Sequence, residues 1–141
     1  MPNPVLLLHG FTGSVESTWV PTGIIELLTD AGREVIAWDL PGHGLADKHH
    51  DPDAYADMEE QLVAQLPEGQ VDGVGFSMGA RTLLCMAAIA PEKFGRLVVA
   101  GVGRNLFERD EAQAERIARG VQGDADDSDV HAQTFARYAS E

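Results

Sequence analysis

Short apolar runs alternate with amphipathic segments along most of this chain. Four apolar runs stand out, at residues 5–8, 35–38, 71–76 and 97–102. The first, second and fourth runs are continuously apolar, which is typical of strands that are buried on both faces of a sheet. The segments between them carry apolar residues at helical spacing, at residues 24–28, 55–66 and 83–89. Strands that alternate with helices predict an α/β fold, a three-layer sandwich in which helices cover both faces of a four-stranded parallel sheet.

The pattern changes after residue 102. Residues 106–119 and 131–138 have the spacing of two polar amphipathic helices, residues 120–129 have the composition of a flexible joint, and no further strand follows. We therefore expect an α/β core at residues 1–104 and a helical segment at residues 105–141. A chain of 141 residues is long enough for one hydrophobic core.

Composition and charge narrow the choice of partners. Ten basic side chains stand against 23 acidic ones, a formal net charge of −13. This charge repels phosphate backbones and anionic lipid headgroups, so we expect neither nucleic acid nor a membrane as a partner. The single cysteine, Cys85, cannot form an intramolecular disulfide, and the N-terminus lacks the pattern of a signal peptide. These features predict a cytoplasmic protein.

A Gly-x-Ser-x-Gly sequence at residues 75–79 joins the third predicted strand to the helix that follows it. A sharp strand-to-helix turn strains the backbone of the serine and exposes its hydroxyl above the sheet, while Gly75 and Gly79 leave room for neighbouring segments. The alternative is a chance occurrence at a tight turn, where glycine and serine are common. The strand before the motif and the helix after it favour Ser77 as a catalytic nucleophile.

The same region offers backbone donors for the negative charge of a tetrahedral intermediate. The amide of Met78 lies at the N-terminus of the predicted helix, where unpaired N–H groups favour an oxyanion. A second donor is expected from the small-residue loop at residues 9–14, where the candidate is the amide of Phe11. This chemistry requires neither a metal nor an organic cofactor.

Histidines are present, but their surroundings favour structural roles for most of them. His9 lies at a strand end beneath the proposed oxyanion loop, where we expect its imidazole to hydrogen-bond to backbone and hold the loop's shape. His43 lies in a proline- and glycine-containing turn, where we expect a structural role. His49, His50 and Asp51 lack further histidines or cysteines at a spacing that completes a tetrahedral ligand set, so we expect no metal site.

Three motifs together resemble the α/β-hydrolase superfamily, in the right order and at the right separations: residues 9–13, 39–44 and 75–81. The resemblance covers about residues 4–104. It implies that the four strands correspond to the family's third to sixth strands, in the spatial order second, first, third, fourth of this chain. It also implies that residues 105–141 begin the family's helical cap.

The resemblance further implies a triad in the chain order serine, acid, histidine, with the acid after the family's seventh strand and the histidine after the eighth. Neither strand is present, so we expect the chain to be a truncated N-terminal half with little activity of its own. His131 is the only histidine after the nucleophile and is the candidate substitute base. Glu108 and Asp110 follow the fourth strand, where some relatives keep the acid.

Three functions fit these residues. The first is a carboxylesterase-like serine hydrolase, in which Ser77 attacks a small carboxylic ester and water later releases the acyl group. The second follows from the 9–11 segment and Arg81, which also resemble the menaquinone-pathway SHCHC synthase; Arg81 would there meet a substrate carboxylate in a lyase reaction. The alternative for Arg81 is an ordinary helix-surface residue. The third is a non-catalytic, dimeric remnant of the fold.

The fourth predicted strand bears on assembly. By the resemblance it would be an interior strand, and a bare apolar edge tends to recruit another strand. We therefore expect self-association, as a homodimer or a higher homo-oligomer.

Overall fold

The computed structural model describes residues 1–108 and 110–139 of the chain. They form two compact units, Met1–Val102 and Gly103–Glu141. The division lies close to the boundary expected after residue 104, and it follows Gly101, whose positive φ of 71° turns the chain out of the last strand.

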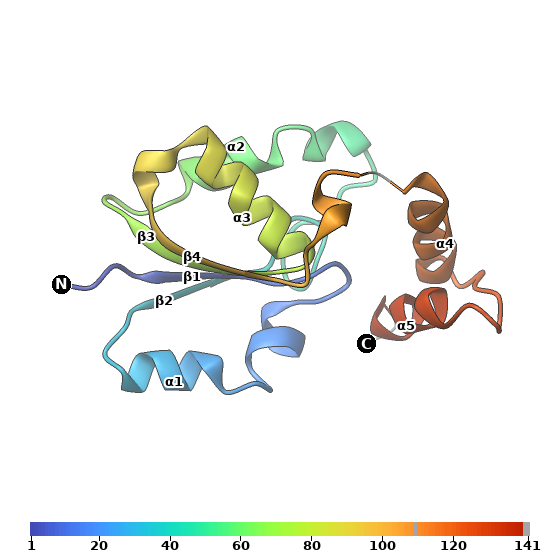
Figure 1. Ribbon diagram of the computed structural model, residues 1–141, viewed down its shortest axis with the longest axis horizontal. Helices are drawn as coiled ribbons and strands as arrows, with labels where there is room; N and C mark the ends of the chain where they lie inside the picture. Colours follow the sequence, from blue (N-terminus) through green and yellow to red (C-terminus); the bar gives the residue numbers. More distant parts are fainter. Residues whose placement is uncertain (109, 140–141) are drawn as a thin grey trace. The chain divides into compact units, whose positions relative to one another are not determined.

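The first unit contains a four-stranded parallel sheet in the order β2-β1-β3-β4, as the resemblance to the α/β-hydrolase superfamily implied (Figure 1). The strands are β1 Val5–Leu8, β2 Val35–Trp38, β3 Val71–Phe76 and β4 Phe94–Ala100. The predicted fourth strand, at residues 97–102, was therefore placed too late. The apolar run marks only the second half of β4, because its first half contains Gly95 and Arg96.

Helices cover both faces of this sheet, which confirms the three-layer sandwich. The helix α1 (Ile24–Asp30) lies on one face, and α2 (Met58–Ala64) and α3 (Met78–Ile89) lie on the other (Figure 1). The helix predicted at residues 55–66 is shorter, because the Tyr55 hydroxyl accepts from the N–H of His49 at 2.8 Å and donates to its carbonyl at 3.0 Å. Those bonds hold Tyr55 in the separate 3-10 helix η2 (Pro52–Tyr55) that precedes α2.

The two faces of β1 divide the core. All four residues of β1 are buried. Leu6 and Leu8 pack with Leu83 and Met86 of α3 on one face, whereas Val5 and Leu7 pack with other residues on the face of α1. The alternation follows from the period of two along a strand, and it makes β1 the central element of the unit.

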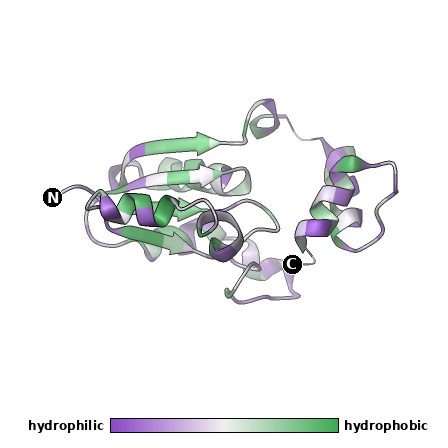
Figure 2. Ribbon diagram, turned by 90° about the horizontal axis from the view of Figure 1, so that it is seen from below, coloured by the Kyte–Doolittle hydropathy of each residue, from purple (hydrophilic) through white to green (hydrophobic). Residues whose placement is uncertain are grey.

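β4 departs from the expectation that a continuous apolar run is buried on both faces. Val98 is 59% exposed and Val99 is 39% exposed, and most other residues of the strand are exposed as well. Hydropathy colouring shows an edge strand whose second half is apolar (Figure 2). The reason is its position, because β4 is the last strand of the sheet among the described residues.

A polar cluster lies near the amino-terminal ends of β3 and β4. The pairing of the two strands shifts register there, between Val71 and Gly73. The Asp72 carboxylate accepts from the N–H of Arg96 at 2.8 Å and from the guanidinium of Arg33 at 2.7 Å. Burial acts to raise the pKa of Asp72, but these hydrogen bonds outweigh it and hold that pKa below its ordinary value. The carboxylate therefore satisfies backbone that the irregular ladder leaves unpaired.

The second unit is a helical pair, α4 (Glu111–Val121) and α5 (Val130–Ala139). The helix predicted from residue 106 begins later, because the Asp110 carboxylate accepts from the N–H of Gln113 at 2.9 Å and caps α4. Gly120, expected in the joint, lies inside α4, where a Cβ would collide with the backbone of Ala132. Among the described residues, no helix is long and apolar enough to cross a membrane.

Candidate active site

The candidate site lies at the carboxyl ends of β1 and β3, which are neighbours in the sheet. Leu8 is in register with Gly75, so the loop after β1 lies beside the turn after β3. A Cβ added to Gly10 would lie 3.1 Å from the Phe76 ring, which shows how closely the two segments pack. The pairing of parallel strands thus brings the two sequence motifs together.

Ser77 has the strained backbone that the sequence predicted. Its φ of 52° and ψ of −113° lie where residues with a side chain are rare. Its N–H donates to the Ala100 carbonyl at 2.8 Å, and its own carbonyl accepts from the N–H of Arg81 at 3.1 Å. These two bonds hold the turn between β4 and the first turn of α3, and they offset the strain.

The two glycines of the motif are required by close backbone contacts. A Cβ on Gly75 would lie 2.6 Å from the Cα of Ala80, and a Cβ on Gly79 would collide with the Leu8 carbonyl oxygen. The end of β1 therefore crosses directly over the start of α3. This confirms the expectation that both glycines make room for neighbouring segments.

The two predicted oxyanion donors lie on either side of this crossing. Met78 is the first residue of α3, so its amide lies at the N-terminus of a 12-residue helix. Phe11 lies in a turn closed by a bond from the N–H of Gly13 to the Gly10 carbonyl at 3.0 Å, and Thr12 there has a φ of 63°. The oxyanion role of both amides stays a prediction.

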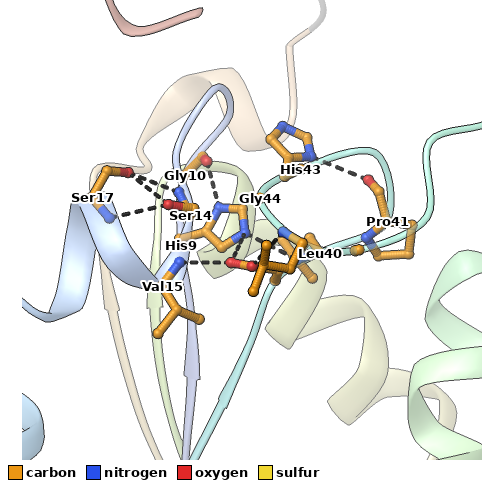
Figure 3. Close-up of polar contacts among 12 residues, drawn as sticks. His9, Gly10, Ser14, Val15, Ser17, Leu40, Pro41, His43 and Gly44 are labelled. Atoms are coloured by element: carbon orange, nitrogen blue, oxygen red, sulfur yellow. Dashed lines mark hydrogen bonds and ion pairs between the residues drawn. The ribbon is translucent and has the colours of Figure 1, made fainter. Parts of the chain in front are cut away.

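His9 is fully buried beneath this turn and joins it to the loop after β2 (Figure 3). Its Nε2 accepts from the N–H of Leu40 at 2.9 Å, so Nδ1 carries the proton and donates to the Gly10 carbonyl at 2.8 Å. Burial lowers the pKa of His9, although the Gly10 carbonyl opposes this effect. The structure confirms the predicted hydrogen bonding to backbone and defines a neutral imidazole, which has no free nitrogen to act as a base.

Asp39 is a positioning residue that sequence reasoning missed. Its carboxylate accepts from the N–H of Val15 at 2.7 Å and from the N–H of Leu45 at 2.8 Å, and it lies 3.9 Å from Nε2 of His9. Burial acts to raise the pKa of Asp39, but these amide hydrogen bonds outweigh it and lower that pKa. The sequence feature that could have revealed this role is an aspartate at the start of the turn at residues 39–44, where a carboxylate often accepts hydrogen bonds from nearby backbone N–H groups.

His43 extends this cluster toward the turn that carries Phe11. Its Nδ1 donates to the Pro41 carbonyl at 3.1 Å. Its ring centroid lies 5.3 Å from that of His9 and 5.6 Å from that of Phe11, the latter in an edge-to-face arrangement. The predicted structural role of His43 is confirmed, and its ring also supports the side chain of Phe11.

The remaining candidate residues have fewer contacts near Ser77. Arg81 is exposed on α3 and forms no ion pair among the described residues. His131 is exposed on α5, in the second unit. Within the part of the chain that the structure describes, no side chain forms a hydrogen bond with the Ser77 hydroxyl, and no cluster of acidic, histidine or cysteine residues could hold a metal ion. The identity of the base therefore stays a prediction.

A parallel sheet whose inner strand ends in a strained serine, directly before a helix, is typical of a hydrolase-type α/β protein. The chain belongs to the alpha/beta hydrolase fold family, which matches residues 3–135. It is 33% identical over 109 residues to esterase Rv0045c of Mycobacterium tuberculosis, covering 74% of this chain and 35% of that relative.

Two further comparisons also find proteins that are named as hydrolases. The chain is 33% identical over 104 residues to 2-hydroxy-6-oxononadienedioate/2-hydroxy-6-oxononatrienedioate hydrolase 1 of Pseudomonas putida, covering 70% of this chain and 36% of that relative. The solved structure of MGS-M2, an alpha/beta hydrolase enzyme from a deep-sea metagenome library, has a similar fold, with a TM-score of 0.68 and 21% identity over 86% of this chain and 42% of that one. The chain thus spans 35% and 36% of the length of the two curated relatives.

Proposed function

We propose that this chain carries the nucleophile and the oxyanion donors of a carboxylesterase-like serine hydrolase that acts on small carboxylic esters. The observation that carries the proposal is the backbone of Ser77, with a φ of 52° between β3 and α3. Backbone strain of this kind costs free energy and is concentrated at functional sites, so it favours a chemical role for Ser77. The esterase name of the mycobacterial relative supports the same class of substrate.

The proposed reaction has two steps. The hydroxyl oxygen of Ser77 attacks the ester carbonyl while its proton passes to a base, and the amides of Phe11 and Met78 donate to the resulting oxyanion. The intermediate collapses, the alcohol leaves with the proton from the base, and an acyl-serine remains. Water then attacks the acyl-serine with help from the same base, which releases the acid and restores Ser77. No metal or organic cofactor takes part.

His131 is the candidate base within the chain, and the alternatives are a residue not yet recognised or one contributed by a longer protein. His9 is excluded by its two backbone hydrogen bonds and its complete burial. Without a base the serine hydroxyl is a weak nucleophile, and loss of a triad member lowers turnover by several orders of magnitude. We therefore expect activity to depend on which residue supplies this group.

Covalent labelling tests the nucleophile. We expect a fluorophosphonate to add a single phosphonyl group to Ser77, because the probe mimics the tetrahedral intermediate. The Ser77→Ala variant should show no adduct by intact-mass spectrometry, whereas Ser128→Ala, which removes an exposed serine of the second unit, should label like the wild type. If His131 is the base, His131→Ala should slow labelling by about 100-fold or more.

Two outcomes would contradict the hydrolase proposal. An adduct that persists in Ser77→Ala would move the nucleophile elsewhere. A wild-type chain that is folded by circular dichroism and yet stays unmodified would favour the third function, a non-catalytic remnant of the fold.

A second candidate function, a lyase reaction like that of the SHCHC synthase, is favoured by Arg81. Its guanidinium is exposed one helical turn after the nucleophile and forms no ion pair among the described residues. An unpaired guanidinium at this distance suits a substrate carboxylate. The Pseudomonas relative is named for a dicarboxylate substrate, which supports a carboxylate-binding residue near the site.

The charge of the substrate distinguishes a carboxylate-binding Arg81 from an Arg81 that is an ordinary helix-surface residue. If Arg81 binds a carboxylate, Arg81→Ala should lower kcat/KM for p-nitrophenyl hemisuccinate by about 10-fold to 100-fold, since a charged hydrogen-bonded pair is lost. The value for p-nitrophenyl acetate should change by less than about twofold. The matched control Arg104→Ala should affect neither ester. Equal losses for both esters would show that Arg81 does not read the carboxylate.

A further inference from the structure

Two residues with side chains hold a backbone conformation that this chain otherwise gives to glycine. Among the described residues, only Thr12 and Ser77 combine a side chain with a positive φ, at 63° and 52°. The other described positions with a positive φ are glycines, at residues 23, 32, 42, 44, 69, 101 and 123. Ser77 is the proposed nucleophile, and Thr12 directly follows Phe11, a proposed oxyanion donor. Both strained residues therefore lie at the candidate site.

The turn alone does not explain a threonine at residue 12. The N–H of Gly13 donates to the Gly10 carbonyl at 3.0 Å, so Thr12 is the third residue of a four-residue turn. A positive φ at the third position is normally supplied by glycine or asparagine. A β-branched residue is rare there, because its Cβ crowds the backbone. Glycine would close the same turn without this strain.

The threonine hydroxyl supplies a contact that glycine lacks. Oγ1 of Thr12 donates to the Phe11 carbonyl at 2.6 Å, which fixes the peptide unit that follows Phe11. The peptide unit that precedes Phe11 is fixed as well, because the Gly10 carbonyl accepts from Nδ1 of His9 at 2.8 Å (Figure 3) and from the N–H of Gly13 at 3.0 Å. Peptide units are planar, so only the two dihedrals of Phe11 between these units could rotate. Phe11 is thus held from both sides.

This arrangement sets the direction of the Phe11 N–H. The peptide bond between Gly10 and Phe11 is trans, so its N–H points opposite to its carbonyl. That carbonyl faces the buried ring of His9, and the Phe11 N–H therefore faces away from it. A carbonyl that accepts hydrogen bonds also polarises its own peptide unit, which strengthens the N–H as a donor. Donors in an oxyanion hole are effective because they are fixed before the reaction begins.

We infer that Thr12 is a positioning residue for the Phe11 amide, whose N–H its hydroxyl and its strained backbone together hold in one direction. The inference rests on the proposed hydrolase function, in which that N–H donates to the oxyanion. Thr12 acts through Phe11 and is not a catalytic residue, because its hydroxyl proton is already donated to the Phe11 carbonyl.

Thr12→Gly separates positioning from stability. Glycine relieves the strain but frees the turn, so the midpoint of urea unfolding should be unchanged or higher. The maximal rate of fluorophosphonate labelling of Ser77 should nevertheless fall about 10-fold or more, because a loose donor stabilises the developing charge less. The probe concentration that gives half of this rate should stay within about twofold.

The matched control is Thr22→Gly in the same unit. It removes a similar hydrogen bond, from the Thr22 hydroxyl to the Trp19 carbonyl at 2.8 Å, at a residue without a positive φ. Glycine has no strain to relieve at this position, so the midpoint of urea unfolding should fall while labelling of Ser77 stays within about twofold of the wild type.

Two further variants test the hydroxyl. Thr12→Val keeps the branched side chain but cannot donate to the Phe11 carbonyl, so labelling should slow by about threefold or more. Thr12→Ser keeps the donor and should label within about twofold of the wild type. Equal labelling rates in these two variants would show that the hydroxyl does not position Phe11.

Nuclear magnetic resonance of the Phe11 amide decides the inference even where Ser77 stays unlabelled. We expect an order parameter of about 0.85 for this N–H in the wild type and in Thr22→Gly, and a fall toward about 0.6 in Thr12→Gly. That fall in a chain that does not label would count against the hydrolase function while supporting the positioning of Phe11. An unchanged order parameter in Thr12→Gly would overturn the inference, as would a loss of labelling that is matched by a loss of stability.

Discussion

Gly79→Ala will destabilise the first unit by about 3 kcal/mol or more, even though alanine is the better helix former. In an ordinary helix interior, replacing glycine by alanine stabilises by up to about 1 kcal/mol. At residue 79 the added Cβ would collide with the Leu8 carbonyl oxygen and would lie 2.5 Å from that of His9. These are backbone atoms at the end of the central strand, so they cannot move aside as a flexible side chain could.

Urea unfolding, followed by the fluorescence of Trp19 and Trp38, measures this loss in the unit that contains both. The matched control is Ala88→Gly, at an exposed position of the same helix, which should cost up to about 1 kcal/mol. Alanine should thus be preferred at residue 88 and glycine at residue 79. An unfolding free energy of Gly79→Ala equal to or above that of the wild type would show that β1 does not cross α3 this closely.

The sequence was sufficient to predict the elements and the strained turn at Ser77, because both depend on local patterns. The continuous run of β1, the helical spacing of α3 and the Gly-x-Ser-x-Gly turn each lie within a dozen or so residues, and the structure confirms the strained Ser77. Gly75 and Gly79 could be assigned a packing role for the same reason. The strand order, which the structure also confirms, came from the family resemblance and not from a local pattern.

What the sequence could not predict depends on contacts between distant segments. The exposure of β4 depends on which strands lie beside it, which the apolar character of the strand does not reveal. The start of α4 was misplaced because the capping carboxylate of Asp110 competes with the apolar residues before it. The links from Asp39 to Val15 and from His9 to Leu40 join segments that are 24 and 31 residues apart.

Those long-range links make His9 the residue whose loss should most disturb the turn that carries Phe11. His9→Ala leaves the N–H of Leu40 without a partner in a fully buried place, and it removes one of the two hydrogen bonds to the Gly10 carbonyl, which keeps the bond from the N–H of Gly13. The orphaned N–H costs about 1 to 3 kcal/mol and the lost second bond about 1 kcal/mol, so we expect a loss of about 2 to 4 kcal/mol in the free energy of unfolding. His9→Gln, whose amide could still accept from Leu40, should lose less. Equal losses in the two variants would contradict this account of the hydrogen bonds.

The neutral imidazole also predicts how stability depends on pH. Burial lowers the pKa of His9 in the folded chain below its ordinary value of 6.5, so the unfolded chain takes up the proton first as pH falls. The contribution of His9 is therefore complete above pH 6.5 and is lost as pH falls from there toward the lower pKa of the folded state. The lowered pKa values of Asp39 and Asp72 act in a separate window, because their contributions are lost only below their ordinary value of 3.8.

Unfolding free energies measured at a series of pH values from above 6.5 down to 3.8 isolate the contribution of His9, because the two carboxylates lose theirs only below 3.8. The wild type should lose stability as pH falls below 6.5, with a limiting slope of about 1.4 kcal/mol per pH unit for one proton. His9→Gln should remove that part of the slope, whereas His50→Gln, at an exposed loop position, should retain it. Fluorophosphonate labelling of Ser77 should slow over the same pH range, since protonated Nε2 can no longer accept from Leu40 and the turn that carries Phe11 is released. A slope that persists in His9→Gln would mean that the proton binds to another group. The neutral His9 imidazole, hydrogen-bonded to Leu40 and Gly10, would then not be the cause of the pH dependence.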